Sequence, residues 1–502
     1  MKKIKLLTAP YKFYNQFMPP TGFCIVSQNL HDNNIDHDKD DLYVKLHHLQ
    51  KKGEINLNLT NDEIVEWQEY ILGKDNKDVE SVVAKIAGLT NFEGYDLLLF
   101  SVGHPTSENI PTNLITHSLF RFLKNKYNPI IITNNLGMGG KDLGLVDEII
   151  PMGNDLLKYL KEKMKFEIKS NFKIGTKQNL EGLPLELYKH HGLIVAGYYF
   201  YEGCPYRCYF CDGFFTQKRK NYTRHITLPN PETIVKEIKG FVGKYGITNL
   251  MFHNTTLNIT EKFASDIAKN MIKSNLDIMW SDCATFKGMT FELLDLLKKS
   301  GCTRLVFGLE TASKTLQKKI NKEVDLNHAT KVLKHCYDIG IWAEVTLLCG
   351  LPYQSYKDLY ETLVFLRDNY KYIRGMNLNR FVIKPMSEFY YNSKEHGLTI
   401  KKVDSIFTTT GFDEANGMDW EEKSKYTQKV YEEILDAIDP ARVDYLRPVN
   451  QVFKIFSNKL PIPLINKYLN SNVLNNDTSK LNQLIEKYKG IISEEEIKES
   501  CN

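Results

Sequence analysis

The sequence predicts an α/β protein with a parallel sheet, a partial (β/α)6 barrel and a mostly α-helical C-terminal region. Short apolar runs typical of buried strands occur at 4–7, 96–102 and 129–133, with helical stretches between the later ones. This alternation is expected of a parallel α/β layer. From about residue 192, a strand followed by a helix recurs six times, which predicts the partial barrel.

The chain of 502 residues is long enough for several domains. We assign 1–165 to the first α/β domain, 166–191 to a polar linker, 192–395 to the barrel and 396–502 to a helical cap. A complete eight-stranded barrel usually needs about 250 residues and eight repeats, so the barrel is expected to be partial. In either architecture, the loops after the strand carboxyl ends carry the chemistry.

Six strands are expected in the barrel, at 195–201, 249–253, 278–284, 304–309, 342–348 and 376–383. The helix after the first strand is delimited by Asn230 as its N-cap, Pro231 in its first turn and Gly246 at its end. Later helices are expected to begin near Thr260, Thr290, Asn327 and Ser355, and the cap contains a helical run at 421–438.

Charge and composition point away from nucleic acid and membranes. The 65 Lys and Arg residues nearly balance 61 Asp and Glu residues, and no run of eighteen apolar residues predicts a membrane span. The basic N-terminus has too short an apolar run for a signal peptide and is expected to be a first strand. Six of the nine cysteines are scattered singly, which is typical of a reducing compartment, so we expect a cytoplasmic protein.

The segment GCPYRCYFCDG places Cys204, Cys208 and Cys211 in a loop after the first barrel strand, opened by Gly203 and Pro205. Three thiolates can converge on one cluster only from a loop, because a helix or strand would point them apart. Three ligands on a 4Fe-4S cluster leave the fourth iron open to a small molecule.

Two alternatives compete with a cluster. A zinc site prefers four ligands, and His225 or His253 would have to complete it, since there is no second cysteine pair. Three inert buried cysteines are the other alternative, and the polar neighbours Arg207 and Asp212 argue against an apolar core segment.

The pattern C-x-x-x-C-x-Φ-C, with Phe210 as the aromatic residue, resembles the signature of the radical S-adenosylmethionine (SAM) superfamily. The segments GCTRLVFGLETASKTLQKKINKE and TLLCGLPYQSYKD are similar to its fourth-strand and fifth-strand regions. The resemblance implies that SAM chelates the open iron and that one electron from the cluster cleaves SAM. The product of this cleavage is a 5′-deoxyadenosyl radical, which attacks a substrate C–H bond. It also implies a flavodoxin or ferredoxin as electron donor.

The resemblance also assigns SAM contacts. Phe210 is similar to the aromatic residue that flanks the adenine, and Glu310 to a ribose contact, with a rim ion pair as its alternative role. Gly350 and Leu351 resemble the turn that meets the adenine. The superfamily's Gly-Gly-Glu run after strand two is absent, and His253 and Asn254 occupy its place, either binding the SAM amine or capping the loop.

The first domain, with segments such as KIKLLTAP and NPIIITNNLGMGGKDLG, resembles the Rossmann-like cobalamin-binding layer that precedes many radical SAM barrels. Loops 101–105 and 134–140 follow strand carboxyl ends and suit a large planar cofactor. The candidate cobalamin contacts are Ser101, His104, Asn135, Gly139 and Gly140. The cobalt-ligating D-x-H-x-x-G motif is absent, since Asp36 and His37 are adjacent without the glycine, and His104 is a candidate by position only.

Three functions therefore stand open. The first is a cobalamin-dependent radical SAM enzyme that methylates or rearranges an unactivated carbon. The second is a radical SAM enzyme without functional cobalamin that cyclises, epimerises or crosslinks a peptide or metabolite. The third is a non-catalytic iron-sulfur or metal-sensing protein. The substrate is a small molecule or peptide, and its identity is not encoded in any motif.

Overall fold

The computed structural model describes residues 2–10, 18–57, 59–102, 110–134, 143–150, 153–173, 177–189, 193–201, 203–211, 226, 228–384, 387–402, 410–443 and 474–500. The chain divides into two compact units. The first comprises 1–199, 241–247 and 404–409, and the second comprises 200–240, 248–403 and 410–502. The domain limits at 165, 191 and 395 stay predictions.

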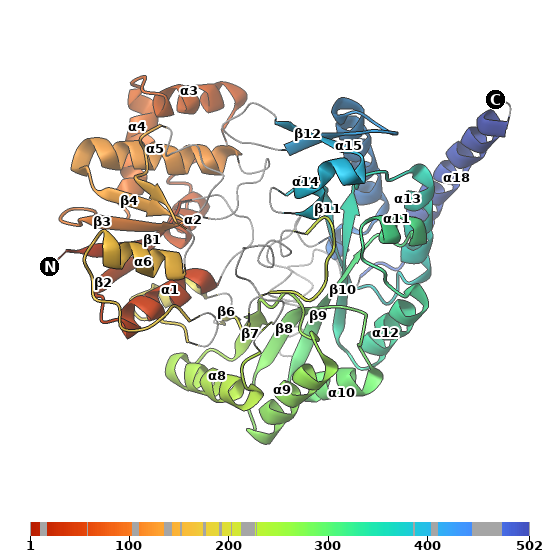
Figure 1. Ribbon diagram of the computed structural model, residues 1–502, viewed down its shortest axis with the longest axis horizontal. Helices are drawn as coiled ribbons and strands as arrows, with labels where there is room; N and C mark the ends of the chain where they lie inside the picture. Colours follow the sequence, from red (N-terminus) through yellow and green to blue (C-terminus); the bar gives the residue numbers. More distant parts are fainter. Residues whose placement is uncertain are drawn as a thin grey trace. The chain divides into compact units, whose positions relative to one another are not determined.

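The first unit contains a five-stranded parallel sheet with the order β2-β1-β3-β4-β5 (Figure 1). Its strands are β1 (Ile4–Thr8), β2 (His37–Asp41), β3 (Leu97–Ser101), β4 (Ile130–Thr133) and β5 (Glu148–Ile149). The three apolar runs of the sequence form β1, β3 and β4, and Leu97 to Phe100 are fully buried. The Rossmann-like sheet is therefore present, with β2 as an edge strand that the apolar pattern did not predict.

Helices cover both faces of this sheet (Figure 1). The helices are α1 (Thr21–Asp32), α2 (Leu42–Lys51), α3 (Asn61–Ile71), α4 (Lys77–Ala87), α5 (Ile110–Tyr127) and α6 (Asn154–Glu162). Side chains from α2 to α5 form one apolar core with Leu7, Leu98 and Phe100 of the sheet. The short 3-10 helix η2 (Leu185–Tyr188) follows in the segment that the sequence assigns to the linker.

A six-stranded sheet with the order β11-β10-β9-β8-β7-β6 forms the partial barrel. Its strands are β6 (Val195–Tyr198), β7 (Asn249–Phe252), β8 (Met279–Ala284), β9 (Cys302–Glu310), β10 (Trp342–Cys349) and β11 (Gly375–Arg380), and β7 to β11 pair in parallel. The helices are α8 (Pro231–Tyr245), α9 (Glu261–Lys273), α10 (Phe291–Lys299), α11 (Lys314–Lys319), α12 (Leu326–Asp338) and α13 (Tyr356–Asp368). All six strands predicted for the barrel are confirmed.

The helix starts follow the caps that the sequence predicted. The hydroxyl of Thr260 accepts the Phe263 N–H at 3.1 Å, and that of Thr290 accepts the Leu293 N–H at 3.2 Å. Ser355 forms a capping box with Asp358. The helix expected near Asn327 begins one residue earlier, because Asp325 is its cap.

The C-terminal region is mostly helical, with α14 (Glu388–Tyr391), η4 (Ser393–His396), α15 (Trp420–Ala437), η5 (Pro440–Arg442) and α18 (Ser479–Ser500). It also holds an antiparallel pair, β12 (Leu398–Lys402) and β13 (Thr410–Glu414), which the sequence pattern did not predict. Helix α18 packs on α13 and α15, where the Tyr488 hydroxyl donates to Glu433 at 2.6 Å. None of the described helices is both long and apolar enough to cross a membrane.

Candidate active site

The cysteine loop is held in place at its start. Gly203 has a φ of +105°, a conformation that favours glycine, and its carbonyl accepts the Thr255 hydroxyl at 2.5 Å. Thr255 follows β7, so the entry to the loop is fixed by the strand that runs beside it. Within the loop, the Cys211 N–H donates to the Cys208 carbonyl at 3.1 Å, which closes a turn between two of the three thiols.

The middle of the loop is held from two other segments. The Tyr209 N–H donates to the Ile320 carbonyl and the Tyr209 carbonyl accepts the Phe389 N–H, both at 3.0 Å. The Asn321 amide adds a hydrogen bond to the Arg207 carbonyl at 2.7 Å. Hydrogen bonds from both segments therefore hold the backbone between Cys204 and Cys211.

Cys204, Cys208 and Cys211 are all half-buried. Burial raises the pKa of the Cys204 and Cys208 thiols, and the nearby Lys322 ammonium acts in the opposite direction on both. Among the described residues, no three His, Cys, Asp or Glu side chains are grouped to hold one metal ion. His225, one of the two residues that the sequence offers as a fourth zinc ligand, lies outside the described residues, so the choice between a cluster and a zinc site stays a prediction.

An ion pair lies beside the cysteine loop. Glu310 ends β9 with a φ of +65°, and its carboxylate lies 3.3 Å from the Lys322 ammonium. The same ammonium lies 6.0 Å from the ring centre of Phe210. Both partners are mostly buried, with side-chain exposures of 16% for Lys322 and 10% for Glu310. Phe210 and Glu310, two of the predicted SAM contacts, thus lie near the same residue, Lys322, which the sequence analysis did not identify.

Asn254 is buried in a hydrogen-bond network. Its side-chain oxygen accepts the Phe200 N–H at 3.1 Å, and its amide nitrogen donates to Asp282 at 2.7 Å. Asp282 also accepts the backbone N–H groups of Asn254 and Cys283. Burial raises the pKa of Asp282 to about 8, although these hydrogen bonds act to lower it. The side-chain oxygen and nitrogen of Asn254 both make hydrogen bonds within the protein. This favours the role of a loop cap, one of the two roles that the sequence left open.

The other predicted SAM contacts lie at the carboxyl ends of β7 and β10. His253 is half-buried, and burial lowers the pKa of its imidazole to about 4, so it is neutral at physiological pH. Leu351 is fully buried and belongs to the same apolar cluster as Phe210. Gly350 has a φ of +84°, and a Cβ at this position would meet the Thr427 hydroxyl of α15 at 2.1 Å.

Polar side chains occur on one face of β10 and β11. Thr346 pairs with Asn377 in register, and the Asn379 amide donates to the Asn377 side chain at 2.9 Å. Alternate residues of a strand share a face, so these groups lie opposite the fully buried apolar residues Leu347 and Leu378.

In the first unit, a hydrogen bond connects the segments that follow the carboxyl ends of β3 and β4. Ser101 ends β3 and is half-buried, and the Asn134 side chain after β4 accepts the Val102 N–H at 2.7 Å. The other candidate cobalamin contacts, His104, Asn135, Gly139 and Gly140, lie outside the described residues. His37 starts β2, so it stands at the opposite end of the sheet from Ser101.

Residues 198–366 match the model of the radical SAM superfamily. This segment is a radical SAM domain. It contains all three cysteines, Glu310 and the Gly350 turn, so the resemblance carried by the cysteine motif is confirmed. The match to an enzyme superfamily also supports the assignment of the chain as an enzyme.

Curated relatives of the chain are methyltransferases by name. It is 25% identical over 185 residues to an uncharacterized methyltransferase of Pyrococcus horikoshii, a match that covers 37% of this chain and 39% of the relative. It is 26% identical over 169 residues to cytidylyl-2-hydroxyethylphosphonate methyltransferase of Streptomyces wedmorensis, covering 32% and 29%. The matches therefore span less than half of either relative.

Solved structures resemble the chain over nearly its whole length. The radical SAM methyltransferase TsrM from Kitasatospora setae, with cobalamin and a 4Fe-4S cluster bound, has a TM-score of 0.62 at 11% identity and covers 98% of this chain and 100% of its own. The cobalamin-dependent radical SAM enzyme OxsB has a TM-score of 0.55 at 13% identity, covering 98% and 79%. These likenesses confirm the predicted fold: a Rossmann-like sheet, a partial barrel and a helical C-terminal region.

Proposed function

We propose that this protein is a cobalamin-dependent radical SAM methyltransferase that acts on an unactivated carbon of a small molecule or peptide. The observation that carries the proposal is the cysteine loop, anchored at Gly203 and Tyr209 and flanked by the Glu310–Lys322 pair. The curated methyltransferases and the shared fold of two cobalamin-dependent enzymes add support.

The residues of this chain take distinct roles in the proposal. Cys204, Cys208 and Cys211 hold a 4Fe-4S cluster, which when bound supplies one electron to SAM and an open iron for its methionine end. Glu310 accepts the ribose hydroxyls, and Phe210 lies against the adenine. Burial disfavours the Lys322 ammonium, but the Glu310 carboxylate and the Cys208 and Cys211 thiolates raise its pKa overall, so Lys322 stays charged and offsets the negative charge of the thiolates.

The cobalamin part of the proposal rests on the first unit. A parallel sheet binds ligands beyond its carboxyl ends, where Ser101 and Asn134 lie. TsrM and OxsB, which share the fold, have cobalamin bound in their structures. A cytoplasmic location and a flavodoxin or ferredoxin as electron donor belong to the same proposal, because the reduced cluster needs a reducing compartment and a one-electron source.

The test is anaerobic reconstitution with iron, sulfide and cobalamin, followed by product analysis with SAM and dithionite. The proposal predicts that corrinoid is retained and that both S-adenosylhomocysteine and 5′-deoxyadenosine form. Cys208→Ala abolishes SAM cleavage, whereas Cys336→Ala, which removes a buried thiol from α12, preserves it. Formation of 5′-deoxyadenosine alone, with no bound corrinoid, would instead support a radical SAM enzyme without cobalamin. The absence of any SAM cleavage would overturn the whole assignment.

A further inference from the structure

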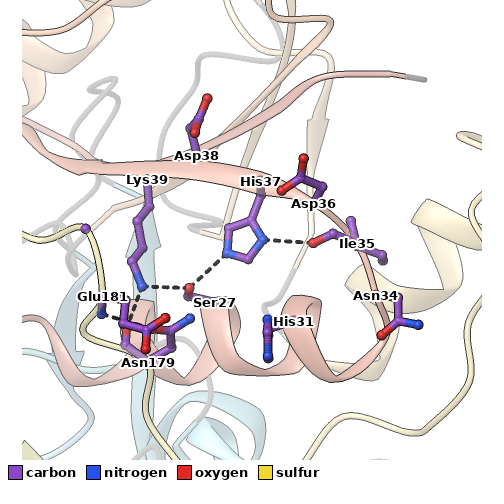
Figure 2. Close-up of a pocket in the computed structure, with 11 residues that line it drawn as sticks. Ser27, His31, Asn34, Ile35, Asp36, His37, Asp38, Lys39, Asn179 and Glu181 are labelled. Carbon is purple, nitrogen blue, oxygen red and sulfur yellow. Dashed lines mark hydrogen bonds between the residues drawn. The ribbon is translucent and has the colours of Figure 1, made fainter. Parts of the chain in front are cut away.

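A pocket of about 640 Å³ lies in the first unit, between the edge strand β2, helix α1 and the segment 179–182 (Figure 2). It opens at the amino-terminal half of β2, at the opposite end of the sheet from Ser101. Figure 2 shows that His37 and Lys39 point from β2 toward α1, whereas Asp38 points to the other side. The pocket is thus separate from Ser101, the candidate cobalamin contact that the structure describes.

Lys39 has neutral hydrogen-bond partners in this pocket. Its ammonium donates to the Ser27 hydroxyl at 3.0 Å and to the Asn179 carbonyl at 2.7 Å, which leaves one of its three protons. The Glu181 carboxylate is paired with Lys244 at 2.6 Å. No described carboxylate lies within ion-pair distance of Lys39. Burial accordingly lowers the pKa of Lys39 to about 8.

The hydrogen bonds around Ser27 show where the formal charge of this group of side chains lies. His37 Nδ1 lies 2.9 Å from the Ile35 carbonyl, which can only accept, so this nitrogen carries the proton. His37 Nε2, 2.8 Å from the Ser27 oxygen, is then the acceptor of the serine hydroxyl. The Ser27 oxygen in turn accepts from Lys39. Because burial also lowers the pKa of His37, the imidazole is neutral and the only buried charge in this chain of bonds is that of Lys39.

We propose that this pocket binds a small ligand through one anionic group, a carboxylate or a phosphate, that takes the remaining proton of Lys39. The Lys39 ammonium is half-buried and its hydrogen-bond partners are neutral, so part of its desolvation cost remains, and an anion would offset that cost. The volume falls in the range of small-molecule sites. Asp36, Asp38 and Glu181 also line the pocket, and their negative charge disfavours polyanions, so the ligand carries a single anionic group.

The experiment uses the full chain and two probes, inorganic phosphate and acetate, titrated calorimetrically at constant ionic strength. The proposal predicts saturable binding of at least one probe, weakened at least tenfold in Lys39→Met and largely retained in Lys39→Arg. Lys51→Met, which removes an exposed lysine from α2, binds like the wild type. A preference for phosphate or for acetate identifies the anionic group.

Equal affinity in the wild type and in Lys39→Met would overturn the proposal, as would the absence of saturable binding to both probes. Reductive cleavage of SAM by Lys39→Met provides a separate readout and is expected at the wild-type level. Normal SAM cleavage would show that the radical SAM domain is intact, so a loss of anion binding in this variant would arise in the first unit.

Discussion

The Lys322 ammonium lies 3.3 Å from the Glu310 carboxylate, across the segment that returns from the end of β9. Lys322 is twelve residues beyond Glu310, and the intervening α11 brings it back toward the cysteine loop. A Cβ at Gly308 would meet the Lys322 ammonium at 2.5 Å, so the glycine leaves the space that the lysine fills. The pair links the proposed ribose contact to the charge of the proposed cluster ligands.

Lys322→Met is expected to destabilise the protein by about 2–3 kcal/mol, because it leaves the Glu310 carboxylate buried without its partner. The free energy of unfolding, measured by chemical denaturation under anaerobic conditions, checks this value. Adding Glu310→Gln to Lys322→Met removes the stranded charge and recovers at least half of the loss. Additive losses in the double variant would show that the two side chains are not coupled.

Asn254→Ala is expected to cost about 2–3 kcal/mol, because it strands the buried Phe200 N–H and removes a donor from Asp282. Asn327→Ala, at an exposed position in the first turn of α12, changes stability by less than about 0.5 kcal/mol. Denaturant titration of both variants makes the comparison. Equal losses would mean that the Asn254 network does not contribute to stability beyond an ordinary surface side chain.

Gly350→Ala is expected to be strongly destabilising, because its φ of +84° is unfavourable for alanine and the new Cβ would meet Thr427. Gly240→Ala is the matched control. Gly240 lies inside α8 with no neighbouring atom within 4 Å of a new Cβ, so alanine there stabilises the helix by about 0.5–1 kcal/mol. Thermal unfolding of the two variants should therefore shift in opposite directions, and a harmless Gly350→Ala would refute the close contact with α15.

The depressed pKa of Lys39 predicts how stability changes with pH. Below about pH 8, Lys39 is protonated in both the folded and unfolded states, and the folded state carries the full desolvation penalty. Between about pH 8 and the ordinary value of 10.5, the folded state loses its proton first, so this lysine makes stability rise with pH. Lys39→Met is expected to be more stable than the wild type at pH 7.

The pH dependence of the difference between the two proteins isolates Lys39 from other groups that titrate in this range. The free energy of unfolding of Lys39→Met minus that of the wild type is expected to be positive and constant below about pH 8 and to shrink above it. A difference that stays constant from pH 7 to 10 would show that Lys39 has an ordinary pKa in the folded protein.

The sequence predicts most of the fold because apolar runs and helix caps act locally. Strand β2 was not predicted because its sequence, HDKDD, has no apolar residue. Its side chains make polar contacts instead, such as the hydrogen bond of 2.5 Å from the Tyr188 hydroxyl to Asp41. The β12–β13 pair was not predicted because its strands are largely polar; only Leu398, Ile400 and Phe412 of the two strands belong to or pack against the apolar cluster that contains Leu351.

The part of the candidate site that depends on residue spacing could be predicted from the sequence. The part that depends on how distant segments come together in the fold could not. The cysteine spacing identified the loop, but the position of Lys322 beside Phe210 depends on how α11 returns to β9. The role of Asp282 could have been predicted from the sequence. A carboxylate inside the largely buried strand MWSDCA needs a buried hydrogen-bond partner, and Asn254 is that partner.

The most direct test of the account is the electron paramagnetic resonance spectrum of the reduced, reconstituted protein with and without SAM. If Cys204, Cys208 and Cys211 hold a cluster with an open iron, SAM shifts the spectrum of the wild type, and Cys208→Ala shows no such cluster signal. A 4Fe-4S spectrum that is identical with and without SAM would contradict the account and would indicate a structural or sensing cluster.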